Sequence, residues 1–352
     1  MSSHHISLRT ALHTIRHSVI ALCATLALSL SACHSIDEND NTILGNFDAL
    51  WDIVDRHYCF FEQKDIDWDE IYRQYLPQAK ACRTAEQLFD VCARMLNELR
   101  DGHVNLSATF NTSYYRKWWS DYPQNYDERL VEEHYLHFDQ CRSSSLIYAM
   151  LPQRIGYISY RSFSSPIGEG NLDAVLSYLE LAQGLIIDVR DNGGGDMTNV
   201  EKLVRRFITE RTLAGYTIHK TGPGHNDFAE PYAYYYDAPE AGRVIWRKPV
   251  VVLCNRSTFS AANNFVSVMR LLPTVTIVGD RTGGGSGMPI SSELPCGWSV
   301  RFSACSFLDA NGESTESGVE PSAGCHVDLD PVQAAQGHDT MLDKAIAVIQ
   351  GQ

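Results

Sequence analysis

The chain reads Leu185-Ile186-Ile187-Asp188-Val189-Arg190-Asp191-Asn192-Gly193-Gly194-Gly195-Asp196 just past its midpoint. An apolar run that leads into glycines is typical of a strand buried on both faces and followed by a loop. Glycines let backbone N–H groups approach a ligand closely and point at developing negative charge. A phosphate cradle is the rival interpretation, but the run has neither the G-x-x-x-x-G-K-S/T nor the G-x-G-x-x-G spacing. We therefore predict a core strand that ends at an anion-stabilising loop.

Strand-like and helix-like runs alternate on both sides of this stretch. The alternation predicts an α/β layered domain over residues 151–352. The expected strands are Ile155–Tyr160, Gly184–Val189, Val250–Leu253 and Thr276–Val278, and the expected helices are Leu172–Leu181, Val200–Phe207, Ser260–Leu271 and Met341–Val348.

The first half of the chain has a different organisation. Residues 46–102 carry apolar side chains at helical spacing, as in Phe47, Leu50 and Val54, which predicts a small helical subdomain. Thr84 stands three residues before Gln87, a pair that favours the start of a helix there. Residues 103–150 are rich in aromatic side chains and have little periodicity, so we expect a connecting segment.

The first 32 residues have the composition of a secretory signal. Arg9 and Arg16 precede an apolar run from Val19 to Leu30, and this part of the chain has no acidic residue. The run is too short for a membrane-spanning helix, which needs about 20 residues. We therefore expect export and removal of residues 1–32.

The end of that signal, Leu30-Ser31-Ala32-Cys33, resembles the cleavage site of a bacterial lipoprotein. The resemblance implies that Cys33 carries lipid and anchors the chain to the cell envelope, with residues 33–45 as a polar tether. An ordinary signal cleaved nearby is the alternative. Residue 34 is a histidine and not the aspartate typical of retention at the inner membrane, so we favour the outer membrane. The sequence does not determine on which face of that membrane the chain lies.

Composition excludes several kinds of partner. The formal net charge is −14, and it becomes more negative when the two arginines leave with the signal. Such an acidic chain is not expected to bind nucleic acid. Export permits disulfides among the cysteines, but their pairing cannot be read from the sequence. No Cys-x-x-Cys spacing occurs, and the His134-x-x-His137 pair fits a helix surface, so we expect neither a metal site nor a cofactor.

A serine follows the expected core strand Val250–Leu253. Val250–Leu253 leads through a short turn to Ser260, at the start of a helix. The positive end of the helix dipole would stabilise charge that develops on this serine, and Ala261 N–H could contact an oxyanion. The alternative is a plain N-cap, because serine is common at that position.

A histidine lies on a turn in the segment Leu99-Arg100-Asp101-Gly102-His103-Val104, between an expected helix and an expected strand. Backbone on both sides can hold such a side chain while it projects into a cleft, which suits a general base. The alternative is a surface or capping histidine.

These three segments together resemble the carboxyl-terminal processing, or tail-specific, serine peptidase family, from about Phe47 to the C-terminus. In that family the nucleophile follows a core strand in a Ser-x-Ser-Glu-like segment, and Ser260 occupies the matching position in Thr258-Phe259-Ser260-Ala261-Ala262. The resemblance implies a crotonase-like α/β peptidase core with the helical N-terminal subdomain beside it.

The chain departs from the pattern of the better-known members in two places, and the first decides which branch it resembles. Better-known members use a lysine about 25 residues after the serine, and Gly285 stands there. The pattern is similar to the tricorn-core branch, in which a histidine in an Asp-Gly-His segment, here His103, is the base and a glutamate orients it. Glu316, just before a Gly-Val-x-Pro turn, is favoured for that role over Glu320. The segment between His103 and Ile155 is also too short for a PDZ domain of about 90 residues.

We therefore expect a serine-type peptidase that acts on peptides or proteins in the cell envelope. Ser260 is the expected nucleophile and His103 its base, while N–H groups of Gly193, Gly194 and Ala261 bind the oxyanion. A histidine pKa near 6.5 predicts activity that falls as the pH drops from about 8 to 5. The alternative is a non-catalytic envelope lipoprotein of the same fold that binds a ligand or peptide. The sequence determines neither the substrate nor the oligomeric state.

Overall fold

The computed structural model describes residues 40–120 and 122–351. The predicted signal, the predicted lipid-bearing Cys33 and most of the predicted tether lie outside the described residues. Within the described ranges, no helix combines the length and the apolar character needed to cross a membrane.

One six-stranded sheet runs in the order β10-β9-β6-β5-β4-β3. Its strands β10, β9, β6 and β5 are parallel, whereas β4 pairs with β5 and β3 pairs with β4 in antiparallel register. All residues of β5, β6 and β9 are buried, which explains why these strands are largely apolar. The bounds are β3 Cys141–Ser143, β4 Leu146–Leu151, β5 Ile155–Tyr160, β6 Gly184–Asp188, β9 Val250–Cys254 and β10 Val275–Gly279.

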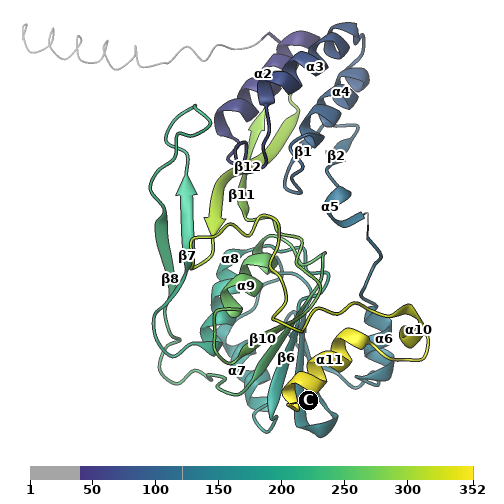
Figure 1. Cartoon of the computed structure of the whole chain (residues 1–352), viewed down its shortest axis with the longest axis vertical. Helices are drawn as coiled ribbons and strands as arrows, with labels where there is room; N and C mark the ends of the chain where they lie inside the picture. Colours follow the sequence, from purple (N-terminus) through teal and green to yellow (C-terminus); the bar gives the residue numbers. More distant parts are fainter. Residues whose placement is uncertain (1–39, 121, 352) are drawn as a thin grey trace, which may run out of the picture. The chain divides into compact units, whose positions relative to one another are not determined.

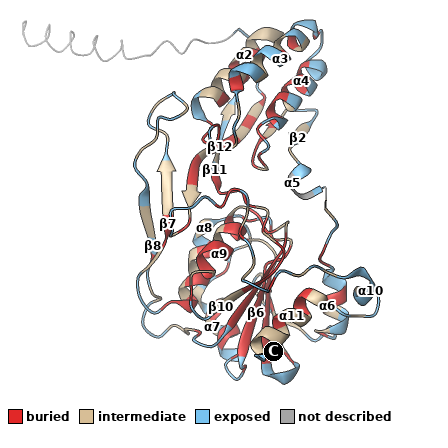
Figure 2. Cartoon of the chain, viewed as in Figure 1, coloured by how far each residue is buried: buried red, intermediate tan, exposed pale blue. Residues whose placement is uncertain are grey.

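Helices cover both faces of this sheet (Figure 1). One face packs against α7, α8 and α9, and the other packs against α6 and α11. Buried residues gather in the strands and on the inward sides of these helices (Figure 2). The predicted α/β layering is therefore present, with helices at α6 Glu128–His134, α7 Glu169–Tyr178, α8 Met197–Val204, α9 Ala261–Met269, α10 Pro331–Ala334 and α11 Thr340–Ile349.

A second six-stranded sheet has the order β2-β1-β12-β7-β8, with β11 paired to β12. Three helices, α2 Ile43–His57, α3 Trp68–Ala81 and α4 Ala85–Asn97, pack against β1 and β12 in a separate apolar core. As predicted, Thr84 caps α4, because its hydroxyl accepts the Gln87 N–H. The bounds are β1 Asn105–Ser107, β2 Thr112–Tyr114, β7 Thr212–His219, β8 Tyr232–Tyr236, β11 Gly287–Glu293 and β12 Ser299–Leu308.

The structure differs from the predicted organisation in three places. The β11–β12 hairpin lies within the predicted core, 151–352, yet Val300 and Phe302 are fully buried in the core of the N-terminal helices. Residues 103–150 are also more than a connection, because they supply two strands to each sheet and the helices α5 Lys117–Ser120 and α6. Helix α2 begins at Ile43, inside the predicted tether, where the Thr42 side chain caps it.

Two loops that matter for function leave the first sheet at the same edge. Because β6 and β9 are parallel neighbours, the segments that follow them emerge side by side. The glycine run follows β6 and Ser260 follows β9, and the Phe259 N–H donates to the Asn192 carbonyl across the gap (3.0 Å).

Candidate active site

Ser260 lies on a strained turn between β9 and α9. Its backbone has φ 58° and ψ −122°, a conformation that a residue with a Cβ atom rarely adopts. The Ser260 N–H donates to the Gly284 carbonyl (2.8 Å), which helps to hold this geometry. The hydroxyl makes no capping hydrogen bond to α9, so a plain N-cap does not describe it. Strain of about 1–3 kcal/mol at such positions is typical of functional turns.

His103 reaches this serine from the second sheet. It lies on the turn before β1, and its Nε2 is 2.9 Å from Ser260 Oγ. The imidazole packs against the ring of Phe259, with the ring centres 4.7 Å apart. Its backbone N–H donates to Asp101 Oδ1 (2.8 Å). With only 3% of its surface exposed, His103 is a buried residue and not the surface histidine of the alternative interpretation.

Burial changes the acid–base behaviour of His103. Loss of hydration lowers the pKa of His103 to about 4, and the charges of Arg301 and Lys64 act in the same direction, while Asp101 opposes them. The pKa near 6.5 expected from the sequence is therefore wrong, because the turn is covered by packing that the sequence does not reveal. The imidazole is neutral at pH 7, as a general base must be.

Asp101 is the carboxylate beside this histidine. Its Oδ1 lies 4.0 Å from His103 Nδ1, and its Oδ2 accepts hydrogen bonds from Ser303 Oγ (2.8 Å) and the Tyr58 hydroxyl (3.1 Å). Burial alone would raise the pKa of Asp101, but the charges of Lys64 and His103 and the hydrogen bonds from the His103 N–H and Ser303 hold it below its ordinary value. His103 Nδ1 is itself buried and has no hydrogen-bond partner among the described residues. A small shift toward Asp101 would satisfy it.

Glu316, the acid expected to orient the histidine, binds elsewhere. Its carboxylate accepts the Ser286 N–H (2.7 Å) and pairs with Lys64 Nζ (2.8 Å), which in turn lies 3.9 Å from Asp101 Oδ2. Burial raises the pKa of Glu316 to about 7, Asp101 adds to the rise, and Lys64 opposes it. The structure thus connects Glu316 to Asp101 through Lys64 and does not place it against the imidazole.

The alternative acid, Glu320, is not at the site. Its side chain is 65% exposed and lies 3.7 Å from Arg281 Nε.

These pKa shifts predict an unusual pH profile. Because a general base works only when neutral, kcat/KM should rise with a midpoint near pH 4 and show no inflection from His103 between about pH 5 and 8, where an ordinary histidine titrates. The measurement is kcat/KM from pH 3.5 to 8, with circular dichroism at each pH to separate titration from unfolding. The Glu316→Gln variant controls for a second inflection near pH 7. A midpoint between pH 6 and 7 that persists in Glu316→Gln would contradict the assignment.

The glycine run packs directly against the serine turn. Gly194 has φ 96°, and a Cβ atom there would lie 2.7 to 2.8 Å from Phe259 O, Ala261 N and Ser260 Cβ. Only glycine therefore brings this loop so close to the nucleophile. The Gly194 N–H, expected to bind an oxyanion, donates instead to Asn192 Oδ1 (3.0 Å). In contrast, the N–H of Ala261 makes no hydrogen bond to any described part of the chain, and Gly193 is exposed.

Arg190 anchors the start of this loop. Its guanidinium pairs with Asp188 (2.6 Å) and with Asp339 (2.7 Å), and all three side chains are fully buried. It also lies over the ring of Tyr126, 4.5 Å from the ring centre. Because Asp339 caps α11, this triad ties the end of β6 to the C-terminal helix.

Gly285 stands where the resemblance to the tail-specific family implies a lysine in its better-known members. Its φ is 79°, and a Cβ atom there would lie 2.3 Å from the ring of Phe259. Phe259 contacts the imidazole of His103, so a side chain at residue 285 would displace the ring that supports the base.

An apolar cavity of about 100 Å³ opens beside Ser260. Its walls come from α8, α9, β11 and β12, and they include Met197, Met288, Pro289 and Phe307. A small apolar side chain of a ligand fits such a space next to the hydroxyl.

Two family models match the chain. The model described as peptidase family S41 matches residues 154–323, and the tricorn protease C1 domain matches residues 40–97. Tricorn protease homolog 1 of Streptomyces coelicolor is 30% identical over 200 residues, which cover 55% of this chain and 17% of that protein. The carboxy-terminal processing protease CtpA of Bacillus subtilis is 28% identical over 174 residues, or 49% of this chain and 35% of that protein. The chain thus spans about a third or less of these relatives.

Solved structures match over most of the chain. A candidate peptidase from Parabacteroides merdae is 46% identical with a TM-score of 0.83, and the match covers 88% of this chain and 97% of that one. Mature CPAF has a TM-score of 0.67 at 11% identity, with 88% and 98% of the two chains covered. At that identity the likeness concerns only the fold, a mixed α/β arrangement with two sheets.

Proposed function

The chain belongs to peptidase family S41, and we propose that it is a serine-type peptidase that hydrolyses peptide bonds of proteins or peptides. One observation carries this proposal: Ser260 Oγ lies 2.9 Å from His103 Nε2, although 157 residues separate the two in the chain. A hydroxyl within hydrogen-bond distance of a neutral imidazole has the geometry of a nucleophile with its base. The strained turn that presents the hydroxyl supports the same role.

The chemistry follows from this pair. Ser260 Oγ attacks the carbonyl carbon of the scissile bond while His103 Nε2 takes the hydroxyl proton. The same nitrogen then gives the proton to the leaving amine, and a water molecule releases the acyl group by the reverse route. Ala261 N–H, at the positive end of α9, is the proposed main oxyanion donor, and Gly193 N–H is the proposed second donor.

Two acids position the base in this proposal. Asp101 Oδ1 accepts a hydrogen bond from the His103 backbone N–H and lies 4.0 Å from His103 Nδ1. Its negative charge therefore stabilises the imidazolium that forms during attack. Glu316 acts one step further away, through Lys64. Both are positioning residues, and Glu316 takes the indirect role in place of the direct one that the resemblance implies.

The finer assignment is to the tricorn-core branch with a crotonase-like core. Its support is the histidine base, the glycine at residue 285 and the packing of that glycine on Phe259. Tail recognition by a PDZ domain has no place in this proposal, because β1 to β4 and α6 occupy the short segment between His103 and β5.

We also propose that lipid on Cys33 anchors the chain to the bacterial envelope, at the outer membrane. The support is the sequence Leu30-Ser31-Ala32-Cys33 after an apolar run. Metabolic labelling with a fatty-acid analogue tests it, and labelling that persists in Cys33→Ala would contradict it.

Peptide hydrolysis tests the activity itself. The chain from Ile36 onward, without lipid, is incubated with a peptide library, and cleavage is followed by mass spectrometry against Ser260→Ala as the matched control. We expect cleavage by the wild type alone. If the folded wild type cleaves no more than Ser260→Ala, the alternative, a non-catalytic protein that binds peptides or another ligand, replaces the proposal.

A further inference from the structure

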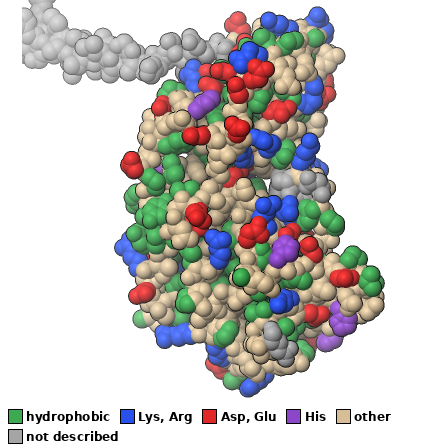
Figure 3. Space-filling view, in the orientation of Figure 1, with side chains coloured by type: hydrophobic (Ala, Val, Ile, Leu, Met, Phe, Trp, Pro, Cys, Tyr) green, Lys and Arg blue, Asp and Glu red, His purple; other side chains and the backbone are tan. Residues whose placement is uncertain are grey.

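Asn263 is a buried polar residue close to the nucleophile. It lies on α9, three residues after Ser260, and only 1% of its surface is exposed. Charged side chains are spread over the face of the molecule drawn in Figure 3, where water hydrates them. An amide inside the protein has no such hydration, so its nitrogen and its oxygen need partners in the fold. The partners of Asn263 therefore indicate what this side chain does.

The amide nitrogen of Asn263 binds one residue of the loop that follows β12. Its Nδ2 donates to the Thr315 hydroxyl oxygen (3.0 Å) and to the Thr315 carbonyl oxygen (3.3 Å). Thr315 directly precedes Glu316, whose carbonyl accepts the Gly285 N–H (3.3 Å). The Asn263 amide thus fixes the backbone next to the residue that carries the Glu316 carboxylate.

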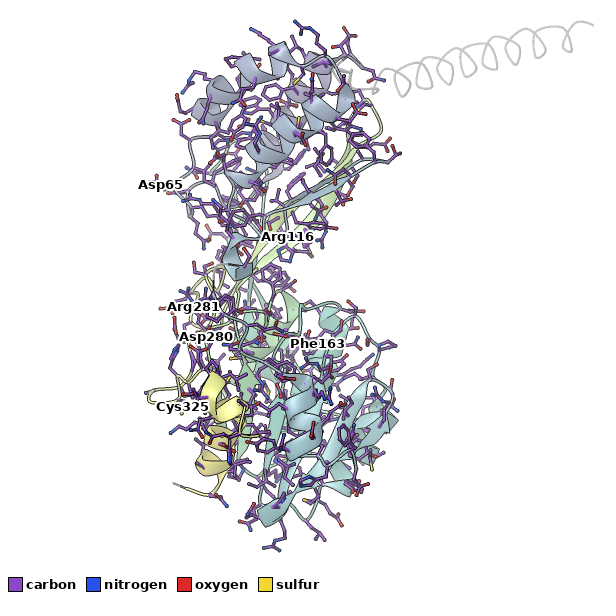
Figure 4. The ribbon with its side chains drawn as sticks, turned by 90° about the vertical axis from the view of Figure 1, so that its right-hand side faces the viewer. Asp65, Arg116, Phe163, Asp280, Arg281 and Cys325 are labelled. Carbon is purple, nitrogen blue, oxygen red and sulfur yellow. The ribbon has the colours of Figure 1, made fainter. Side chains whose placement is uncertain are left out.

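The amide oxygen of Asn263 binds a second loop, which follows β10. Figure 4 labels Asp280 and Arg281, the two residues of this loop that precede Thr282. Asn263 Oδ1 accepts a hydrogen bond from the Thr282 hydroxyl (2.6 Å), whose oxygen in turn accepts the Val319 N–H (2.6 Å). The Thr282 hydroxyl thus joins the two loops to each other, and the amide joins both of them to α9.

Both loops form part of the surroundings of Ser260. The Gly284 carbonyl, in the loop after β10, accepts the Ser260 N–H (2.8 Å) and helps to hold its strained turn. Asn263 and Thr315 line the apolar cavity beside Ser260, together with Gly285. Because residues three apart on a helix lie on the same face, Asn263 connects the turn of the nucleophile to both loops directly.

We propose that Asn263 is a positioning residue, which keeps Ser260 and Glu316 in the arrangement that catalysis needs. The proposal rests on the proposed peptidase function and adds a residue to the groups that support it. Asn263 acts through its hydrogen bonds to Thr282 and Thr315. An amide suits this task, because it donates and accepts at once and brings no charge into the buried site.

Loss of the amide should lower kcat and change KM little. Displacement of a reacting group by about 1 Å slows catalysis by up to about 100-fold. We therefore expect Asn263→Ala to lower kcat by about 10- to 100-fold, with KM within about threefold. Asn263→Asp keeps an acceptor but loses the donor at pH 7, so it should not restore kcat. A kcat of Asn263→Ala within about twofold of the wild type would overturn the proposal.

A double variant tests whether the hydrogen bonds carry the effect. Thr282→Val removes the hydroxyl that donates to Asn263 Oδ1. If Asn263 acts through this loop, Thr282→Val lowers kcat by about threefold or more, and Asn263→Ala/Thr282→Val is no slower than the slower single variant. An unchanged kcat in Thr282→Val, or losses that add in the double variant, would contradict the proposal.

A matched asparagine separates positioning from loss of stability. The amide of Asn171, at the start of α7, donates to Ser143 Oγ and accepts the Gly168 N–H, both at 3.0 Å. Asn171→Ala should lower the midpoint of thermal unfolding and leave kcat within about twofold. Every variant is assayed well below its own midpoint. If Asn171→Ala loses as much kcat as Asn263→Ala, general loosening explains the loss and the proposal is wrong.

The rate of fluorophosphonate labelling separates this inference from the proposed function. Labelling requires an activated Ser260 but no bound peptide. Labelling of Asn263→Ala at about a tenth of the wild-type rate or less supports the positioning role, even if no peptide is hydrolysed. Equal labelling rates overturn this inference alone, and the proposed peptidase function stands. A folded wild type that does not label contradicts the proposed function, and the inference falls with it.

Discussion

Replacing His103 with alanine should lower kcat for peptide hydrolysis by about 10⁴- to 10⁶-fold. The reason is that Ser260 Oγ has one base within hydrogen-bond distance among the described residues, at 2.9 Å. Without that base the hydroxyl keeps its proton during attack, and the leaving amine receives none. Activity is measured with the peptide that the wild type cleaves best, with Ser260→Ala assayed beside it.

The two substitutions should not be additive. Because nucleophile and base act as a unit, the double variant Ser260→Ala/His103→Ala should be no slower than the worse of the single variants. His338→Ala is the control, since that histidine, on the loop before α11, is 59% exposed and its Nδ1 lies 3.5 Å from Asp343 Oδ2. A His103→Ala protein that keeps more than about a tenth of the wild-type kcat would show that another group is the base.

Replacing Arg190 with alanine should lower the free energy of unfolding by about 3–5 kcal/mol. The substitution leaves Asp188 and Asp339 buried, both fully, without the positive charge that now pairs with them at 2.6 and 2.7 Å. It also removes the contact with the Tyr126 ring. Denaturant unfolding followed by circular dichroism measures the change.

The matched control for this stability prediction is Arg129→Ala. Arg129 is 84% exposed and lies 3.6 Å from Glu133, so its loss should change stability by no more than about 0.5 kcal/mol. If Arg190→Ala lowers the free energy of unfolding by less than about 1 kcal/mol, the buried triad of Arg190, Asp188 and Asp339 does not anchor the glycine loop.

The elements that carry unbroken apolar runs were predictable from the sequence. Strand Ile155–Tyr160 has the predicted bounds, and the strands before the glycine run and before Ser260 differ from prediction by one residue at one end. These strands are buried on both faces, so most of their positions are apolar and the local signal is strong.

Long-range packing was not predictable in the same way. The β11–β12 hairpin joins the N-terminal helices because Val300 and Phe302 complete their core, and this pairing depends on contacts about 200 residues apart in the sequence. Likewise, the pKa of His103 depends on how deeply its turn is covered, which no local pattern encodes.

The candidate site was partly visible in the sequence. Ser260 and His103, singled out separately, lie 2.9 Å apart in the structure. Asp101 lies two residues before His103 and is assigned no role from the sequence, although an acid at that spacing from a histidine on a turn is a usable signal. Lys64 gave no signal, because its two acidic neighbours, Asp101 and Glu316, come from distant parts of the chain.

The most direct test of the central claim, that Ser260 and His103 form a nucleophile and its base, is covalent labelling with a fluorophosphonate. The chain from Ile36 onward is treated at pH 7, and intact-mass and peptide mass spectrometry locate the adduct. We predict a single adduct on Ser260 in the wild type and none in Ser260→Ala or His103→Ala, each shown to be folded. A folded wild type that stays unlabelled, or a His103→Ala variant that labels at the wild-type rate, would contradict the claim.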